Sequence, residues 1–205
     1  MEKWLKEKIK LNLMVKLTGL KKIKTAVFIS GTGSNLKNLI KFSKAKNSPI
    51  SIDLIFSNTP RAKGLKYSNQ FNIKKYVSSF KSSKITEVKI LNLLKKESIE
   101  FICLAGFMRI LSKSFIKKFN GKIVNIHPSL LPKYKGLDTH VRAIQNKDKL
   151  AGCTVHLVTA KLDSGKIILQ KKVKILKNDT PTSLAKKVLT QEHKLYPAAI
   201  KKIFN

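Results

Sequence analysis

Apolar runs and amphipathic stretches alternate through the first two thirds of the chain. Strand-like apolar runs occupy residues 24–30, 50–56, 73–77, 101–105 and 122–126. Between them, apolar positions at helical spacing predict helices over residues 35–42, 61–70, 86–96 and 113–119. Buried strands interleaved with helices form open parallel sheets with right-handed crossovers. The pattern therefore predicts the α/β fold class: a Rossmann-like, open, mostly parallel twisted sheet with helices on both faces.

The pattern changes after residue 127. A helix is predicted over residues 139–145, and apolar runs at 154–158 and 167–175 predict a strand pair joined by a turn. Thr180 and Pro181 are helix start signals, so the last helix is expected to begin near Thr182. The C-terminal part of the sheet is therefore expected to be antiparallel. No repeat, low-complexity segment or linker divides the sequence, which predicts one domain over residues 24–205 behind a basic extension, residues 1–23.

The net charge of +32 comes almost wholly from lysine. Arg61, Arg109 and Arg142 are the only arginines, and the lysines are spread over the whole chain. Nucleic-acid sites instead favour arginine and concentrate their charge on one face. A basic RNA-binding protein is the non-enzyme alternative, but it would need clustered charge beside exposed aromatics. Lysine, isoleucine and asparagine share A/T-rich codons, so composition drift is the favoured explanation and no specific nucleic-acid partner is expected.

The sequence shows no pattern typical of a membrane protein, a secreted protein or a metal-binding protein. No apolar stretch reaches the ~20 residues that a membrane-spanning helix needs. Residues 1–20 lack a continuous signal-peptide core, so we expect a cytoplasmic protein with no membrane partner. Cys103 and Cys153 lie in strand-like runs, and the four histidines show no metal-ligand spacing, so no metal is expected.

The strand over residues 122–126 carries candidate chemistry. It holds Asn125 and leads directly into His127, and Pro128 and Pro132 stiffen the exit because each ring locks φ. An asparagine amide can donate to a developing oxyanion, and an imidazole can exchange a proton near neutral pH. The pair therefore suits acyl chemistry. A capped strand end with one satisfied histidine is the alternative.

A further candidate, Asp163, lies in the turn between the two C-terminal strands. Aspartate is common in turns because its side chain bonds the local backbone. Beside His127, its carboxylate would instead orient the imidazole and favour the protonated form. No serine or cysteine has an obvious nucleophile motif, so the trio points to direct transfer onto an external nucleophile. His156 alternates with apolar neighbours and is expected to be a buried, hydrogen-bonded histidine.

Ligands of open α/β sheets bind outside the carboxyl ends of the strands. Three segments are expected there, residues 31–35, 106–111 and 125–132. The first, Gly-Thr-Gly-Ser-Asn, is a glycine-rich strand-to-helix turn whose N–H groups could cradle a phosphate. It matches neither the dinucleotide nor the P-loop pattern, and a tight turn without a ligand is an equal alternative.

Five stretches together resemble the phosphoribosylglycinamide formyltransferases, a branch of the folate-dependent formyltransferase superfamily. They are S-G-T-G-S-N at 30–35, L-A-G-F-M-R-I-L at 104–111, N-I-H-P-S-L-L-P-K-Y at 125–134, L-D-S-G at 162–165 and T-Q-E-H-K-L-Y-P at 190–197. The Asn-His-Asp trio is shared across the superfamily, whereas the first and last stretches point to this branch. The resemblance implies the formyltransferase fold and transfer of a formyl group from 10-formyltetrahydrofolate to the amine of 5′-phosphoribosylglycinamide. That reaction belongs to purine (IMP) biosynthesis and passes through a tetrahedral intermediate.

The resemblance also implies a role for each site residue. Asn125 and His127 would be the oxyanion stabiliser and the general acid, and Asp163 would hold and polarise His127. The ribonucleotide would bind through Gly33, Ser34, Asn35 and Glu192. The folate would bind along Met108, Arg109, Ile110, Leu111, Asn125, Thr159, Ala160, Lys161, Leu162 and Asp163. The implied partners are these two small molecules, and the protein would be a monomer or a weak homodimer.

Some positions depart from the pattern of the family. Asp138 stands where some relatives have histidine, and Leu189 stands where relatives have a polar phosphate contact. Residues 80–84 lack an arginine that some relatives have, with Lys84 as a substitute. Methionyl-tRNA formyltransferase and formyltetrahydrofolate deformylase share the trio and are the alternatives, but both resemble longer chains with an added domain.

Overall fold

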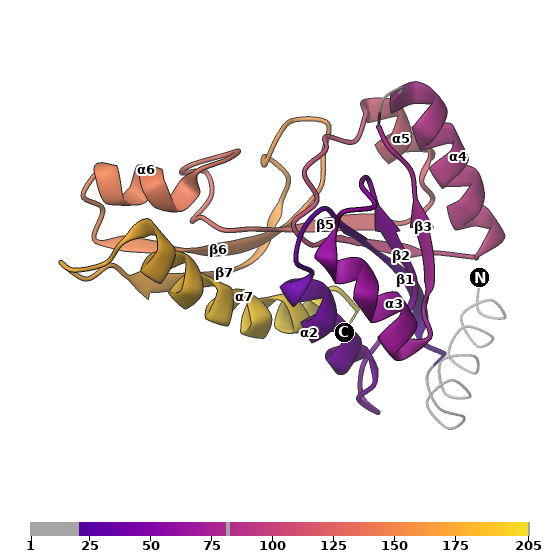
Figure 1. The fold of residues 1–205 in the computed structure, drawn as a ribbon, viewed down its shortest axis with the longest axis horizontal. Coiled ribbons are helices and arrows are strands. Elements are labelled where there is room, and N and C mark those ends of the chain that lie inside the picture. The colour runs from indigo at the N-terminus through magenta and orange to yellow at the C-terminus, as the bar shows by residue number, and fades with distance from the viewer. Residues whose placement is uncertain (1–20, 81–82, 205) are drawn as a thin grey trace, which may run out of the picture.

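The computed structural model describes residues 21–80 and 83–204 (Figure 1). Most of the basic extension expected over residues 1–23, up to residue 20, lies outside the described residues. The described strands form one seven-stranded sheet in the order β3-β2-β1-β4-β5-β6-β7. Their bounds are β1 Ile23–Ile29, β2 Ile50–Ser57, β3 Lys74–Val77, β4 Phe101–Leu104, β5 Lys122–His127, β6 Leu150–Leu157 and β7 Ile167–Lys174.

The sheet changes direction at β5. Strands β1 to β5 pair in parallel, whereas β6 is antiparallel to β5 and β7 is antiparallel to β6. A parallel strand covered on both faces is buried on both sides, which is why β1 is fully buried from Thr25 onward and ends in the apolar run Ala26–Ile29. The predicted mostly parallel sheet with an antiparallel C-terminal part is confirmed.

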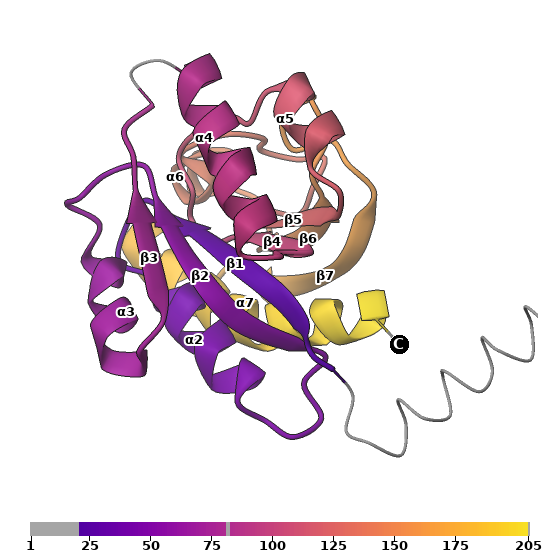
Figure 2. The same cartoon turned by 90° about the vertical axis from the view of Figure 1, so that its right-hand side faces the viewer.

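Helices cover both faces of the sheet (Figure 2). Their bounds are α2 Ser34–Ser43, the 3-10 turn η1 Lys63–Leu65, α3 Lys66–Phe71, α4 Ser83–Lys96, α5 Lys113–Lys118, α6 Thr139–Gln145 and α7 Pro181–Phe204. On one face, α2 and the long α7 bury residues such as Leu39, Val188 and Tyr196. On the other, α4 and α5 bury Leu94 and Phe115. None of the helices in the described part of the chain combines the length and apolar character needed to span a membrane.

Most elements begin or end one to three residues from their predicted bounds, and two of the differences have a clear structural cause. The helix predicted over residues 61–70 begins at Lys63 as a 3-10 turn and becomes α-helical only from Lys66, because Ala62 is still extended after Pro60. Strand β6 begins at Leu150, earlier than the predicted residue 154. Its added start contains Gly152, where a Cβ would lie 2.1 Å from the backbone oxygen of Lys171. The pairing of β6 with β7 therefore needs a glycine there, and glycine does not look like a strand residue in the sequence.

Candidate active site

The candidate catalytic side chains converge at the carboxyl end of β5. Asn125 and His127 are two positions apart on this strand, so both side chains leave the same face of the sheet. Antiparallel pairing with β6 sets Asn125 opposite His156. The turn that follows β6 brings Asp163 against both histidines (3.4 Å to His127 and 3.6 Å to His156).

His127 is buried and contacts the protein through both ring nitrogens. Its Nε2 lies 2.8 Å from the backbone oxygen of Tyr134. A carbonyl can only accept a hydrogen bond, so this contact places a proton on Nε2. Nδ1 lies 3.4 Å from Asp163 Oδ2. Burial lowers the pKa of His127, while the Tyr134 carbonyl and the Asp163 carboxylate partly oppose that fall. The free protein therefore favours a neutral ring, with its positive form supported by two acceptors.

Asp163 is held by the backbone of a neighbouring loop. Its Oδ2 accepts a hydrogen bond from the Gly136 N–H at 2.9 Å. Its own backbone is left-handed, with φ at 44°, a conformation that Asp and Asn tolerate better than most residues. Burial raises the pKa of Asp163, but His156, the Gly136 N–H and His127 together lower it below its ordinary value. The carboxylate therefore stays ionised beside the two imidazoles.

His156 is a site residue whose role sequence reasoning missed. It is buried and hydrogen-bonded, as expected, but its partners belong to the site. Its Nδ1 donates to the backbone oxygen of Leu157 at 2.8 Å, which leaves Nε2 of the neutral ring to accept from Asn125 Nδ2 at 3.3 Å. This contact fixes which way the Asn125 amide points. The signal needed to find it was the strand register, which no local sequence pattern carries.

The glycine-rich turn after β1 meets the last helix. Gly33, the N-cap of α2, has φ at 74°, and a Cβ on it would lie 2.7 Å from the Cα of Gly64. Only glycine fits this approach and this conformation. Asn35 Nδ2 donates to Glu192 Oε2 at 2.6 Å across 157 residues of sequence. Among the described residues, Asn35 Oδ1 is buried and has no hydrogen-bond partner. Burial raises the pKa of Glu192, and the Asn35 bond opposes the rise.

Two exposed strips flank this site at the same edge of the sheet. Met108 and Ile110 expose 62% and 68% of their surfaces. Leu111 is buried in the same core cluster as Phe115 of α5. The Met108 N–H donates to Ser30 Oγ at 2.8 Å, which ties this strip to the end of β1. The second strip, residues 159–162, is exposed in the turn before Asp163. Apolar side chains that stay exposed beside a polar cluster are typical of a ligand groove.

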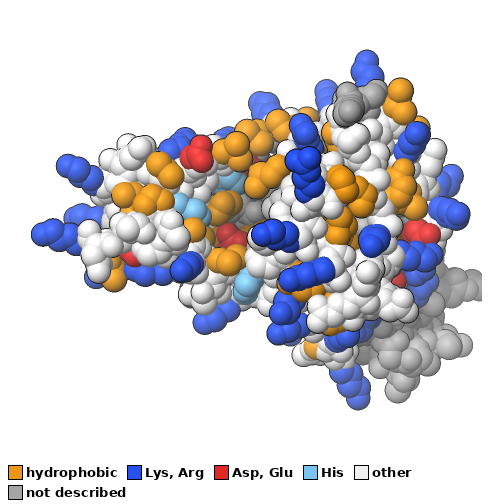
Figure 3. Space-filling model, viewed as in Figure 1, with side chains coloured by type: hydrophobic (Ala, Val, Ile, Leu, Met, Phe, Trp, Pro, Cys, Tyr) orange, Lys and Arg blue, Asp and Glu red, His pale blue; other side chains and the backbone are white. Residues whose placement is uncertain are grey.

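The surface is hollowed where these segments meet. Figure 3 shows this hollow between the part of the molecule with α6 and the part with β1 to β3, and histidine and acidic side chains are visible in it. Blue lysine and arginine side chains are scattered over the whole face rather than gathered there (Figure 3). A larger cavity of about 630 Å³ lies at the amino edge of the sheet, beside Lys21, Glu100 and Asn120. That edge lies opposite the one at which such sheets bind ligands.

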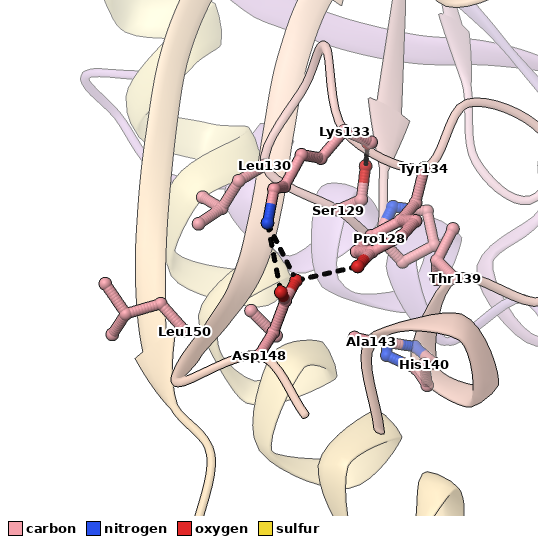
Figure 4. Close-up of a pocket in the computed structure, with 11 residues that line it drawn as sticks. Pro128, Ser129, Leu130, Lys133, Tyr134, Thr139, His140, Ala143, Asp148 and Leu150 are labelled. Carbon is pink, nitrogen blue, oxygen red and sulfur yellow. Dashed lines mark hydrogen bonds and ion pairs between the residues drawn. The ribbon is translucent and has the colours of Figure 1, made fainter. Parts of the chain in front are cut away.

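A small cavity lies between the segment that follows β5 and the segment from α6 to β6 (Figure 4). It holds about 10 Å³, roughly the space of one water molecule, and Pro128, Tyr134, His140 and Asp148 are among its lining residues. It is too small for a substrate. Within residues 21–80 and 83–204, no three His, Cys, Asp or Glu side chains are grouped as metal ligands.

A doubly covered sheet with polar chemistry at its carboxyl edge is the architecture of an α/β enzyme. The family model described as formyl transferase matches residues 23–200, and the chain belongs to this family. It is 40% identical to phosphoribosylglycinamide formyltransferase of Escherichia coli, over 85% of this chain and 84% of that protein. The crystal structure of phosphoribosylglycinamide formyltransferase from Brucella melitensis is 45% identical and superposes with a TM-score of 0.85, covering 89% of this chain and 96% of that one.

A second kind of relative is much longer. The chain is 43% identical to the human trifunctional purine biosynthetic protein adenosine-3 over 88% of its own length. It spans only 18% of that protein.

Proposed function

We propose that this protein transfers the formyl group of 10-formyltetrahydrofolate to the amine of 5′-phosphoribosylglycinamide, a step of purine biosynthesis. The observation that carries the proposal is the meeting of Asn125, His127 and Asp163 at the carboxyl edge of the sheet. The likeness to phosphoribosylglycinamide formyltransferases over most of both chains supports the choice of substrates.

In this proposal the trio stabilises charge on the formyl oxygen. The Asn125 amide, oriented by His156, donates to that oxygen as the amine attacks the formyl carbon. Protonated His127 supplies a second donor and a positive charge. Its Nε2–H is engaged at 2.8 Å, whereas Nδ1 is 3.4 Å from Asp163, longer than a good hydrogen bond. Nδ1–H is therefore the donor that would bond the formyl oxygen, because less hydrogen-bond energy is lost when it turns away from Asp163 than when Nε2–H leaves the Tyr134 carbonyl.

The transfer needs no nucleophile from the protein. The neutral amine forms a bond to the formyl carbon, and the bond from that carbon to N10 of the folate then breaks. One proton leaves the amine and N10 gains one, so the step is balanced without an oxidant or a metal. What the protein adds is alignment of two bound ligands, which can contribute several kcal/mol.

The two ends of the site suit the two ligands. The cradle formed by Gly33, Ser34 and the start of α2 would hold the phosphate, since helix N–H groups favour anions. Glu192 and the unpaired Asn35 Oδ1 would accept from ribose hydroxyls. The folate would lie along residues 108–111 and 159–163, with Met108 and Ile110 against its rings. Leu111 would contribute its backbone, because its side chain is buried.

We further propose the setting in which this site operates. Residues 24–205 would act as one domain in the cytoplasm, as a monomer or weak homodimer that binds these two small molecules and no specific nucleic acid. Sedimentation across a concentration series tests the oligomeric state. A salt titration of RNA binding tests the partner, because nonspecific attraction to lysines falls steeply as salt rises.

The deciding experiment is a formyl-transfer assay with two acceptors. Wild-type protein and 10-formyltetrahydrofolate are mixed with glycinamide ribonucleotide or with methionyl-tRNA, and product is measured for both. We expect transfer to the ribonucleotide alone. Transfer to the tRNA, or release of formate without an acceptor, would replace this proposal with one of the two alternative activities.

A further inference from the structure

One loop supplies backbone contacts to both members of the His127–Asp163 pair. Residues 133–138, which we name the bridge loop, lie in the connection between β5 and α6 and lead directly into α6. The Tyr134 carbonyl contacts His127 Nε2 at 2.8 Å, and the Gly136 N–H donates to Asp163 Oδ2 at 2.9 Å. Both contacts are made by backbone atoms, so they persist only while the loop keeps its conformation.

That conformation is costly to hold. Tyr134, Gly136 and Asp138 all have positive φ, at 54°, 77° and 57°. Left-handed backbone is strained at Tyr134, whereas aspartate and glycine tolerate it better, and such strain persists only where surrounding contacts fix it. The bridge loop therefore needs an anchor outside the site.

Arg142 on α6 provides such an anchor. Its Nη1 donates to the Lys135 carbonyl at 2.8 Å and to the Leu137 carbonyl at 3.3 Å, the two residues that flank Gly136. Its guanidinium also lies 5.0 Å from the centre of the Tyr134 ring. A single side chain thus contacts the loop on both sides of Gly136 and at the ring of Tyr134, the two residues whose backbone groups hold the catalytic pair.

The hydroxyl of Tyr134 provides a second anchor (Figure 4). It donates to Asp148 Oδ2 at 2.8 Å and accepts from Asn146 Nδ2 at 3.0 Å. Lys133 Nζ also contacts Asp148, at 3.0 Å. These contacts fix the tyrosine tip, but they do not reach Gly136, which leaves that part of the loop to Arg142.

We propose that Arg142 is a positioning residue, which fixes the bridge loop so that Tyr134 and Gly136 hold His127 and Asp163 in register for catalysis. The reach of the guanidinium matters as well as its charge, because the side chain of lysine is one bond shorter and lacks the planar fork. The kinetic part of the idea rests on the proposed function, whereas the structural part does not.

The test compares Arg142→Met and Arg142→Lys with a matched control, Arg61→Met. Arg61 is exposed, and within the described part of the chain its side chain makes no hydrogen bond or ion pair, its backbone N–H alone contacting Thr59. Imidazole N–H exchange in histidine-labelled protein reports the His127–Tyr134 contact without substrate. We expect faster exchange of His127 Nε2–H in both Arg142 variants and wild-type exchange in Arg61→Met.

Kinetics give the second readout. Misplacing a catalytic group commonly costs ten- to a hundredfold, so we expect kcat to fall about tenfold in Arg142→Met with the KM values nearly unchanged. In a His127→Ala background the same change should cost almost nothing, because positioning an absent ring has no effect. An equal loss in both backgrounds, unchanged exchange, or full recovery in Arg142→Lys would overturn the proposal. A wild-type protein that transfers no formyl group would refute the function alone, since the exchange result would stand.

Discussion

Replacing Asp163 with asparagine isolates the charge of the carboxylate from its shape. Asparagine is isosteric and tolerates the left-handed backbone at φ 44°, and its oxygen can still accept from the Gly136 N–H. The change therefore removes the attraction between the carboxylate and a positive His127 ring at 3.4 Å. At an effective dielectric constant of about 20, that attraction amounts to about 5 kcal/mol. Since about 1.4 kcal/mol is tenfold in rate, and the amide dipole replaces part of the loss, kcat should fall about 10³-fold.

The assay separates chemistry from binding. Single-turnover formyl transfer gives the rate of the chemical step, and calorimetry with a folate analogue gives affinity. Asp53→Asn is the matched control, because Asp53 also accepts from a backbone N–H, that of Thr25, in the first half of β2. Turnover within a few fold of wild type in Asp163→Asn would refute the electrostatic role. Folate affinity falling as far as turnover would show that the side chain serves binding instead.

The same variant makes a pH prediction with a definite sign. Burial lowers the pKa of His127, and Asp163 opposes that fall. Without the carboxylate the pKa falls further, so the alkaline limb of the rate profile should move to lower pH. The other charged groups that act on the ring, His156 and Arg142, both lower its pKa and are unchanged in this variant. An alkaline limb that stays in place or moves upward contradicts the assignment.

Three further predictions concern the ribonucleotide end of the site and the stability of the fold. Gly33→Ala should cost about 1–3 kcal/mol of folding stability, because its Cβ would lie 2.7 Å from Gly64 Cα, and it should weaken ribonucleotide binding more than folate binding. Gly31→Ala is the control, because a Cβ there meets nothing within 4 Å. Glu192→Gln should weaken ribonucleotide binding yet raise the melting temperature more at pH 8 than at pH 4. The raised pKa means that burying this carboxyl favours the fold below its unfolded pKa, and that contribution is lost as pH rises through the folded value. For Asp179, the Leu176 N–H, Lys187 and Ser183 hold the pKa down to about 2. Its contribution is therefore present above the unfolded pKa of about 3.9 and is lost as pH falls towards 2, so the destabilisation in Asp179→Asn should shrink between pH 7 and pH 3 in urea titrations.

Most helices and strands of this fold could be predicted because buried positions repeat along the sequence with the period of a strand or a helix. The apolar runs of β1 and β2 are buried almost throughout. In α4, the apolar residues Ile90 and Leu94 are four positions apart, and both face the core. The pattern failed where local geometry was decided by a distant partner. Gly152 belongs to β6 only because the Lys171 backbone passes close to it, and nothing near Gly152 in sequence signals this approach.

The candidate site divides in the same way. Asn125 and His127 lie on one predicted strand, so their common face followed from its two-residue period. His156 needed the register between β5 and β6, a property of two strands together. Tyr134 and Gly136 contact the site through backbone atoms, which every residue has. The residue types at these positions therefore could not predict the contacts. The roles assigned to individual site residues stay predictions until the variants are measured.

The contact between Asn35 and Glu192 joins the first helix of the described chain to its last. During synthesis the N-terminal half emerges first, so Asn35 and the proposed phosphate cradle leave the ribosome before Glu192. Until α7 has been made, one face of the sheet also lacks the cover that Val188 and Tyr196 provide. The proposed ribonucleotide binding should accordingly appear only once α7 has been made and has packed on the sheet. The proposed ribonucleotide would then bind only after folding is nearly complete, and it would stabilise only chains in which α2 and α7 are in contact.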